Sequence, residues 1–227
     1  MEQQLVVEMK DISISFNGVY ALKNINHAIV GHNGAGNSTL MKVLMGAYQP
    51  DSGRVFLHGK EVDFRSPGEA QQSKISMVWQ ELSNFPNLSI TENMMMSRFE
   101  RNDAKQIDWQ KNREKCKEYL ARMELSDIDP DMKMSVLPLA QQQLVEFAKA
   151  LSFNPDVLIL DEPTSALSNT EEKVLYEKVR LIKAQGVAII YISHKLEEVF
   201  ALTDRVSVFR DGKKIFTKGR NSGRYCR

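Results

Sequence analysis

The sequence predicts an α/β fold, in which a parallel sheet is covered by crossover helices and interrupted by a helical stretch. Three observations support this class. The first 30 residues or so contain strand-like segments. Between about residues 88 and 152 the strand signals disappear and helical periodicity replaces them. After residue 156 strand-like and helix-like segments alternate, which is typical of parallel strands joined by helices.

Composition and charge exclude several classes of protein. The 30 basic and 29 acidic side chains leave a net charge of +1, which argues against a polybasic nucleic-acid binder. The longest β-rich apolar run, residues 187–192, is far shorter than the roughly 18 residues of a membrane span. The amino terminus lacks the basic and apolar regions of a secretory signal, and Cys116 and Cys226 lack disulfide or metal-ligand spacing. We therefore expect a reducing, cytoplasmic setting.

Short strands and one buried helix are predicted before residue 80. The expected strands are residues 5–7, 12–16, 28–30, 54–57 and 75–78. The expected helix covers residues 38–45, because its apolar residues fit a buried helical face. Gly46 follows at the position where glycine commonly ends a helix.

The rest of the chain is predicted to form helices first, and then strands that alternate with helices. The expected helices are one that begins at Thr91 and the segments 108–123, 141–151, 170–183 and 195–201. The expected strands are residues 157–160, 187–192 and 205–209, followed by a turn at Asp211-Gly212. Met94, Met95 and Met96 are interpreted as helix packing residues.

A glycine-rich segment immediately before the first predicted helix has the pattern of a phosphate-binding loop. It consists of Gly31, His32, Asn33, Gly34, Ala35, Gly36, Asn37, Ser38 and Thr39. The glycines let backbone N–H groups turn toward phosphate oxygens, the helix adds its positive end, and the Ser38 hydroxyl is a potential Mg²⁺ ligand. Asn37 stands where the pattern requires lysine. Taken alone, the segment is equally compatible with a simple turn before a helix.

Two carboxylates follow the predicted strand 157–160, at the end of a strand where ligands bind in open α/β sheets. Asp161 is placed to hold Mg²⁺ through water. Glu162 is placed to orient or polarise the water that attacks a γ-phosphate. A solvated helix N-terminus is the alternative and is favoured for such a pair taken alone, but the continuation PTSALS at 163–168 argues against it.

Taken in order along the chain, the motifs resemble the ATP-binding cassette of ABC transporters. They are the segment 31–39, Gln80, LPLAQQQ at 137–143, DEPTSAL at 161–167 and ISH at 192–194. The segments VWQEL at 78–82, NLSITEN at 87–93 and AQQQ at 140–143 resemble the monosaccharide-importer branch and its amino-terminal cassette. The resemblance covers about residues 5–217.

The resemblance implies the architecture, cofactors and partners. The fold would be a P-loop NTPase core with a parallel sheet, an antiparallel β edge subdomain and an inserted helical subdomain at about 88–152. The ATP-binding domain would span residues 1–217. Residues 218–227 lose all periodicity and resemble nothing in the family, so we expect them to form a disordered tail. ATP and Mg²⁺ would bind, and the partners would be a membrane permease, a second cassette and, indirectly, an extracytoplasmic sugar-binding protein.

The resemblance also implies roles for individual residues. Phe16 would stack on adenine, with Tyr20 as a second candidate. Gln80 would reach Mg²⁺ and the attacking water and would sense the permease. His194 would contact the γ-phosphate and link Glu162 to the partner cassette, although a lone histidine after a strand is also compatible with a helix cap. The signature motif of the family corresponds to LPLAQQQ at 137–143. The remaining implied residues are Pro138, Ala140 and Gln141 in this motif, and Ser38, Gln80 and Asp161 at the metal.

Several residues depart from the family pattern. Asn37 cannot supply the ammonium of the missing lysine, and Pro138 lacks the hydroxyl and N–H of the signature serine. Ser168 replaces an aspartate but can still cap a helix. The strand at 28–30 is too short, which would either remove an edge strand or force a buried one to be rebuilt from Asn26 and His27. We discount His27 and His32 as metal ligands for want of partners.

These departures predict weak nucleotide binding and slow or absent hydrolysis. A non-catalytic remnant or regulatory cassette that binds a permease or another cassette is therefore the second hypothesis. Soluble ABC proteins of translation or DNA repair would need basic inserts or a long coiled coil, and the near-neutral charge argues against them. Which sugar is transported lies outside what a cassette sequence determines.

Overall fold

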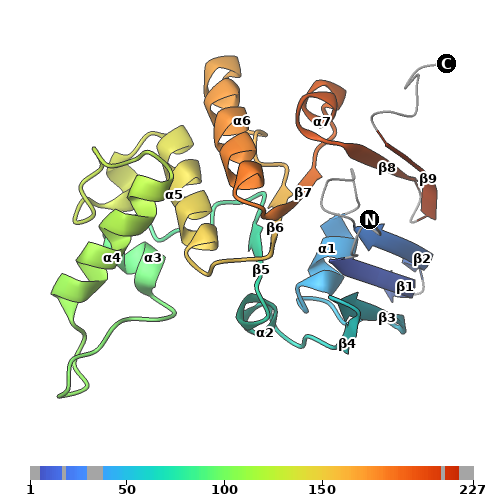
Figure 1. The fold of residues 1–227 in the computed structure, drawn as a ribbon, viewed down its shortest axis with the longest axis horizontal. Coiled ribbons are helices and arrows are strands. Elements are labelled where there is room, and N and C mark those ends of the chain that lie inside the picture. The colour runs from blue at the N-terminus through green and yellow to red at the C-terminus, as the bar shows by residue number, and fades with distance from the viewer. Residues whose placement is uncertain (1–5, 17–18, 30–37, 211–212, 220–227) are drawn as a thin grey trace.

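The computed structural model describes residues 6–16, 19–29, 38–210 and 213–219. A helical subdomain lies at one end of the molecule and an antiparallel sheet at the other, with a parallel sheet between them (Figure 1). The parallel sheet, the antiparallel sheet and the inserted helices match the predicted fold class. The described residues include no helix that is both long and apolar enough to cross a membrane.

The antiparallel sheet has the strand order β2-β1-β3-β4. Its strands are β1 (Val7–Phe16), β2 (Val19–Ile29), β3 (Ser52–Leu57) and β4 (Lys60–Val62). The prediction of two separate strands at 5–7 and 12–16 was wrong, because the chain continues as one irregular strand. Its pairing shifts register between Met9 and Ile12, where Asp11 has a φ of 54°.

β2 is much longer than the predicted strand at 28–30. Its backbone pairs with β1 from Val19 to Ile29, at the end of the sheet order. An edge strand tolerates polar residues, so Asn24 and Asn26 do not stop it. The short strand was expected either to remove an edge strand or to force a buried strand to be rebuilt from Asn26 and His27, and neither occurred. The edge strand is retained, and the described residues contain no strand of the parallel sheet ahead of α1 (Ser38–Leu44).

The parallel sheet forms the centre of the molecule. Its order is β5-β6-β7, with β5 at Ile75–Val78, β6 at Val157–Asp161 and β7 at Ala188–Ile192. All residues of these strands are buried, which explains their continuous apolar sequences. Along β6, Val157 and Ile159 join the hydrophobic cluster that contains α1 and the antiparallel sheet. Leu158 and Leu160 join the cluster of the helical subdomain.

The helical stretch predicted after residue 88 is confirmed and forms a helical subdomain. It contains α3 (Ile90–Met95), α4 (Trp109–Arg122), the 3₁₀ turn η1 (Met134–Val136) and α5 (Leu139–Leu151). Ser89 caps α3 in a capping box with Glu92. Met94 and Met95 are buried in this core, which confirms the packing interpretation for these two residues, whereas Met96 is exposed.

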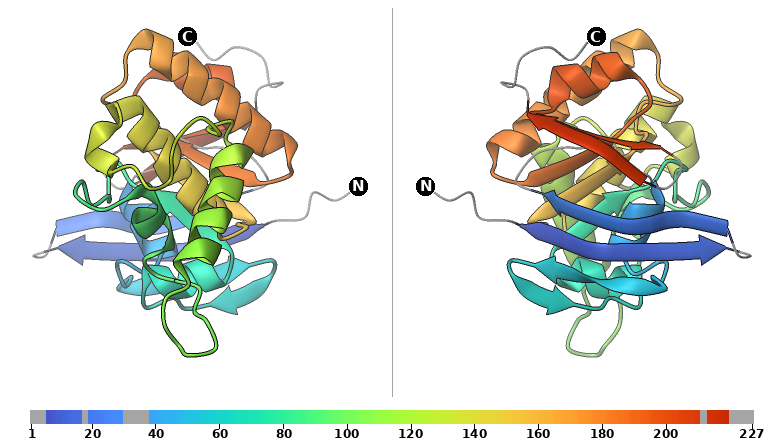
Figure 2. Two further views of the ribbon diagram at one scale, coloured as in Figure 1. Left: turned by 90° about the vertical axis from the view of Figure 1, so that its left-hand side faces the viewer. Right: turned by 90° about the vertical axis from the view of Figure 1, so that its right-hand side faces the viewer.

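The remaining elements lie around the sheets. They are α2 (Pro67–Gln72), which the sequence did not predict, α6 (Asn169–Ala184), α7 (Leu196–Leu202), β8 (Arg205–Arg210) and β9 (Lys213–Gly219). The β8–β9 hairpin lies over the antiparallel sheet (Figure 2), where β9 contacts β2. Lys218 and Gly219 pair with β8, so the prediction of a disordered tail was wrong for these two residues; residues 220–227 lie outside the described part.

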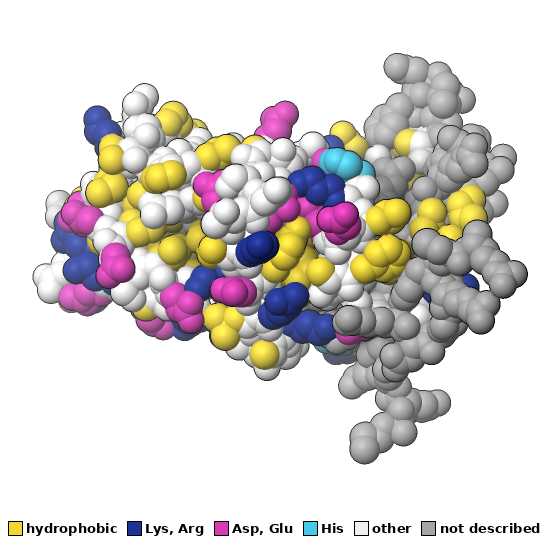
Figure 3. Space-filling model, turned by 90° about the horizontal axis from the view of Figure 1, so that it is seen from above, with side chains coloured by type: hydrophobic (Ala, Val, Ile, Leu, Met, Phe, Trp, Pro, Cys, Tyr) yellow, Lys and Arg dark blue, Asp and Glu magenta, His cyan; other side chains and the backbone are white. Residues whose placement is uncertain are grey.

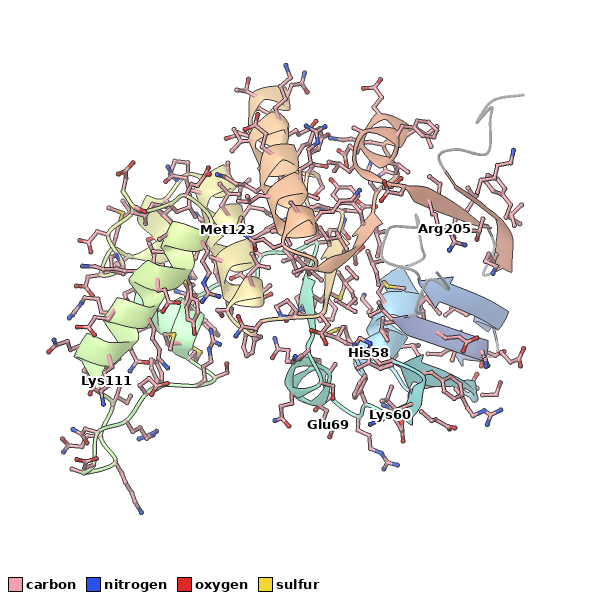
Figure 4. The ribbon with its side chains drawn as sticks, in the orientation of Figure 1. His58, Lys60, Glu69, Lys111, Met123 and Arg205 are labelled. Atoms are coloured by element: carbon pink, nitrogen blue, oxygen red, sulfur yellow. The ribbon has the colours of Figure 1, made fainter. Side chains whose placement is uncertain are left out.

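Polar contacts tie the two sheets together. His58, which follows β3, places Nε2 3.2 Å from an oxygen of Asp156 at the start of β6. Lys74 lies 3.5 Å from the other carboxylate oxygen. Figure 4 shows His58 between the antiparallel sheet and the core. Charges of both signs are interspersed with apolar side chains on the face in Figure 3, in keeping with the near-neutral composition.

Gly46 ends α1 as predicted, and its replacement by alanine is expected to destabilise the fold by about 2–5 kcal/mol. Its φ is +68°, and an added Cβ would lie 2.6 Å from the carbonyl oxygen of Phe64. Urea denaturation measures the loss. Gly59→Ala is the matched control, because φ is +77° but no atom lies within 4 Å of an added Cβ. Equal losses in both variants would contradict the steric explanation.

Candidate functional site

The carboxyl ends of the three parallel strands bring predicted site residues together. Gln80 lies just beyond β5, Asp161 is the last residue of β6, and His194 lies just beyond β7. Because these strands are parallel and adjacent, the three positions share one edge of the sheet.

Glu162 lies between two of the predicted partners. Gln80 donates from Nε2 to one Glu162 oxygen at 3.2 Å. His194 Nδ1 lies 3.2 Å from the other oxygen. The Glu162 side chain is 26% exposed and that of His194 is 68% exposed, so the cluster opens toward solvent. A carboxylate held between an amide and an imidazole at a sheet edge is a suitable proton acceptor for water.

The backbone at Glu162 is held in an unusual conformation. Its φ of +44° lies in the left-handed region, which costs on the order of 1–3 kcal/mol for such a residue. Its N–H donates to the carbonyl of Ile192 at 2.9 Å, across to the end of β7. This bond ties the carboxylate-bearing residue to the strand that leads to His194. Strain of this kind is concentrated at functional positions.

A cavity of about 490 Å³ opens beside this cluster. Its lining includes Lys42, Trp79, Gln80 and Asp161. Asp161 is almost fully buried, and its carboxylate with the Gln80 amide gives the hard oxygen donors that Mg²⁺ prefers, so the residues present fit this ion. Among the described residues no cluster of three or more His, Cys, Asp and Glu side chains forms a metal site on its own.

The sequence interpretation missed Lys42 and Trp79. Lys42 lies one helical turn after Ser38, so it is on the same face of α1 as the predicted Mg²⁺ ligand. The spacing of four residues was a usable signal. Trp79 directly precedes Gln80, but its position in the cavity depends on how the chain leaves β5.

The predicted signature residues lie apart from the Glu162 cluster in the described contacts. Pro138 is the N-cap of α5 and makes no side-chain capping bond. Ala140 and Gln141 are half-buried in the first turn. Asn84, in the segment after Gln80, donates to Gln142 Oε1 at 3.0 Å and so links that segment to α5. Pro138, Ala140 and Gln141 line a second, more apolar cavity of about 400 Å³.

Ser168 caps α6 as expected. Its hydroxyl accepts from the Glu171 backbone, and the Glu171 carboxylate accepts from the Ser168 N–H at 2.8 Å. The Ser168 hydroxyl also donates to the Glu171 carboxylate at 2.7 Å, and this bond, together with the one from the Ser168 N–H, holds the pKa of Glu171 below its usual range. The substitution of serine for aspartate therefore leaves the helix start intact.

Several predicted residues lie outside the described part. Gly31, His32, Asn33, Gly34, Ala35, Gly36 and Asn37 do so entirely. Only the backbone is described for Phe16, Tyr20, His27 and Ser38. Thr39, which follows in α1, is half-buried. Their assigned roles stay predictions.

Comparison with known proteins identifies the family. The family described as ABC transporter matches residues 20–165. The chain belongs to the ABC transporter family. It is 42% identical over 223 residues to the galactose/methyl galactoside import ATP-binding protein MglA of Escherichia coli, covering 95% of this chain and 44% of that protein. The cassette thus spans less than half the length of the curated relatives it matches.

Solved structures support the fold of the cassette. A nucleotide-free ATP-binding cassette from an ABC transporter superposes with a TM-score of 0.84 at 23% identity, covering 95% of this chain and 91% of that one. A subunit of an ABC transporter complex from Clostridium perfringens gives a TM-score of 0.79 at 24% identity, covering 95% and 89%. These likenesses confirm the predicted fold class.

Proposed function

We propose that the cassette is the ATP-binding part of an importer that couples ATP binding and hydrolysis to monosaccharide uptake through a membrane permease. The name of the Escherichia coli relative, an import ATP-binding protein for galactose and methyl galactoside, supports this class of transport. In this proposal the cassette lies peripherally on the cytoplasmic face of the plasma membrane. It works with a second cassette and, indirectly, with an extracytoplasmic sugar-binding protein, and binds no nucleic acid.

The contact of Glu162 with Gln80 and His194 carries the proposal. Glu162 would accept the proton of the water that attacks the γ-phosphate, and His194 would contact that phosphate and orient Glu162. Asp161, Gln80 and the Ser38 hydroxyl would hold Mg²⁺. When bound, this ion neutralises charge on the β- and γ-phosphates. Phe16 or Tyr20 would stack on adenine, and the loop 31–39 would surround the phosphates.

The same proposal includes impaired nucleotide handling by this chain. Asn37 offers a neutral amide where a lysine would form charge-assisted hydrogen bonds worth about 1.5–3 kcal/mol. ATP affinity is then reduced roughly ten- to a hundredfold. Pro138 removes both donors expected from a signature serine, which weakens the contact of Ala140 and Gln141 with ATP on an opposing cassette.

A cassette that binds its partners without ATP turnover is the alternative, and β2 favours it. The strand before the phosphate loop is a member of the antiparallel sheet in the described residues. The described chain ahead of the loop therefore ends in a different sheet from the strands that lead to Asp161 and His194. Capture of the permease by the purified chain, combined with an ATPase assay, separates the alternatives. Capture without hydrolysis supports the non-catalytic cassette.

Trp79 provides a direct test of nucleotide binding. It lines the same cavity as Asp161 and Gln80, so we expect ATP with Mg²⁺ to change its fluorescence in a saturable way. Trp109 is 46% exposed on α4, and Trp109→Phe leaves Trp79 as the single tryptophan. The expected Kd is roughly ten- to a hundredfold higher than in the same chain with Asn37→Lys.

Trp79→Phe, with Trp109 retained, is the control for this binding measurement, because its signal should not respond to ATP. Equal Kd values with Asn37 and with lysine at this position would contradict the predicted impairment. An absence of saturable binding in both chains would contradict the proposed ATP site itself.

A further inference from the structure

Glu198 is a carboxylate buried in the third position of α7, with 2% of the residue exposed. Burial of a charged group is costly unless hydrogen bonds and counter-charges replace water. Glu198 was not among the predicted site residues. Its contacts show why the fold tolerates it.

Both carboxylate oxygens of Glu198 are occupied. Thr164 donates from its hydroxyl to Oε1, and Lys195 Nζ lies 3.4 Å from the same oxygen. Tyr191 donates from its hydroxyl to Oε2 at 2.9 Å. Tyr191 and Thr164 are themselves buried, so these bonds are shielded from water.

The partners of Glu198 flank the Glu162–His194 contact on both sides. Thr164 lies two residues after Glu162. Tyr191 lies in β7, three residues before His194, and Lys195 directly follows His194. The buried carboxylate therefore joins the segment that bears the proposed proton acceptor to the segment that bears the imidazole.

We propose that Glu198 is a positioning residue that sets the contact between His194 and Glu162 through Thr164, Tyr191 and Lys195. It acts through these three neighbours rather than by touching the reacting groups. This role rests on the proposed function, because the importance of the contact comes from hydrolysis. The effect of Glu198 on the contact between His194 and Glu162, however, does not depend on whether the chain hydrolyses ATP.

The charge state of Glu198 agrees with this role. Burial works against ionisation, yet hydrogen bonds from Thr164, Ser193 and Tyr191 and the nearby Lys195 ammonium hold its pKa below the usual range. Glu198 is thus an acceptor from every partner at neutral pH. A protonated carboxyl would replace one acceptor with a donor and loosen the set.

The network continues into α6. Lys195 also pairs with Glu172, and Tyr176 donates to Glu172 at 3.3 Å.

An acidic residue in the first turn of a helix can also serve simply as a helix-dipole partner. Glu197, adjacent on α7, is exposed and is suited to that general role, which makes it the natural comparison.

The ring nitrogen signal of His194 tests the proposal in the full native chain. The nitrogen-15 shift of its Nδ1 reports the contact with Glu162, the His194→Gln chain assigns the signal, and Glu162→Ala, which removes the acceptor, gives the value for a broken contact. In Glu198→Gln we expect the shift to move at least halfway to that broken-contact value. In Glu197→Gln, the same change at an exposed site, we expect the native value.

Thr164 gives a second, milder pair of variants if Glu198→Gln fails to fold in thermal denaturation. Thr164→Val should move the His194 signal in the same direction, and Thr164→Ser, which keeps the hydroxyl, should restore it. A native His194 signal in folded Glu198→Gln or folded Thr164→Val would overturn the proposal. Since the signal needs no ATP turnover, an inactive chain still decides the question, and failure of hydrolysis counts only against the proposed function.

Discussion

Replacement of Asn37 by lysine is expected to raise ATP turnover by about 100- to 1,000-fold. The physical reason is the charge that develops on the β- and γ-phosphates as the bond breaks. A pre-organised cationic donor stabilises that charge more in the transition state than in bound ATP, so kcat should rise more than affinity. Steady-state hydrolysis by the purified chain with Mg²⁺, with and without the substitution, measures the effect.

Asn37→Gln is the matched control for this prediction, because it lengthens the side chain without adding a charge. We expect its turnover to stay near that of the native chain. A native chain that already hydrolyses ATP at the rate of the Asn37→Lys chain would contradict the predicted impairment. If lysine did not raise turnover while ATP still bound in the Trp79 assay, the cause of slow hydrolysis would lie elsewhere. The place of β2 in the antiparallel sheet would then be the first cause to test.

The sequence predicted the elements whose patterns are set locally. β6 and β7 are apolar on both faces, and the structure buries every residue of both. Asp108 starts α4 and Ser168 starts α6 as caps, so these helices begin close to where they were expected. Gln80, Glu162 and His194 come together because parallel strands bring their carboxyl ends to one edge.

Features that depend on pairing between distant segments were missed. The polar residues Asn24 and Asn26 do not fit the strand pattern, so the sequence did not predict the length of β2. Pairing with β1 stabilises this strand, and its own composition does not favour it. Lys42 and Glu198 are ordinary charged residues on helices in sequence terms. Their significance comes from the cavity beside Asp161 and from the buried bonds to Thr164 and Tyr191.

Substitution of Glu162 by glutamine, in a chain that carries Asn37→Lys, is expected to lower kcat by about 10²- to 10⁴-fold. The amide keeps the shape of the carboxylate but cannot accept a proton from water. Because the left-handed backbone at this residue and its bond to Ile192 do not involve the carboxylate, we expect the fold to be retained. ATP hydrolysis gives kcat, and Trp79 fluorescence shows whether ATP still binds.

Glu177→Gln, on the exposed surface of α6, is the control for this substitution and should leave kcat unchanged. Retained ATP binding with lost turnover identifies Glu162 as the group that acts on water, because a residue that served only to bind would raise the Kd instead. If the Glu162→Gln chain hydrolysed ATP as fast as its Asn37→Lys parent, the proton acceptor would have to be another group. Asp161 would then be the next carboxylate to test, since it directly precedes Glu162 and lines the cavity beside Gln80.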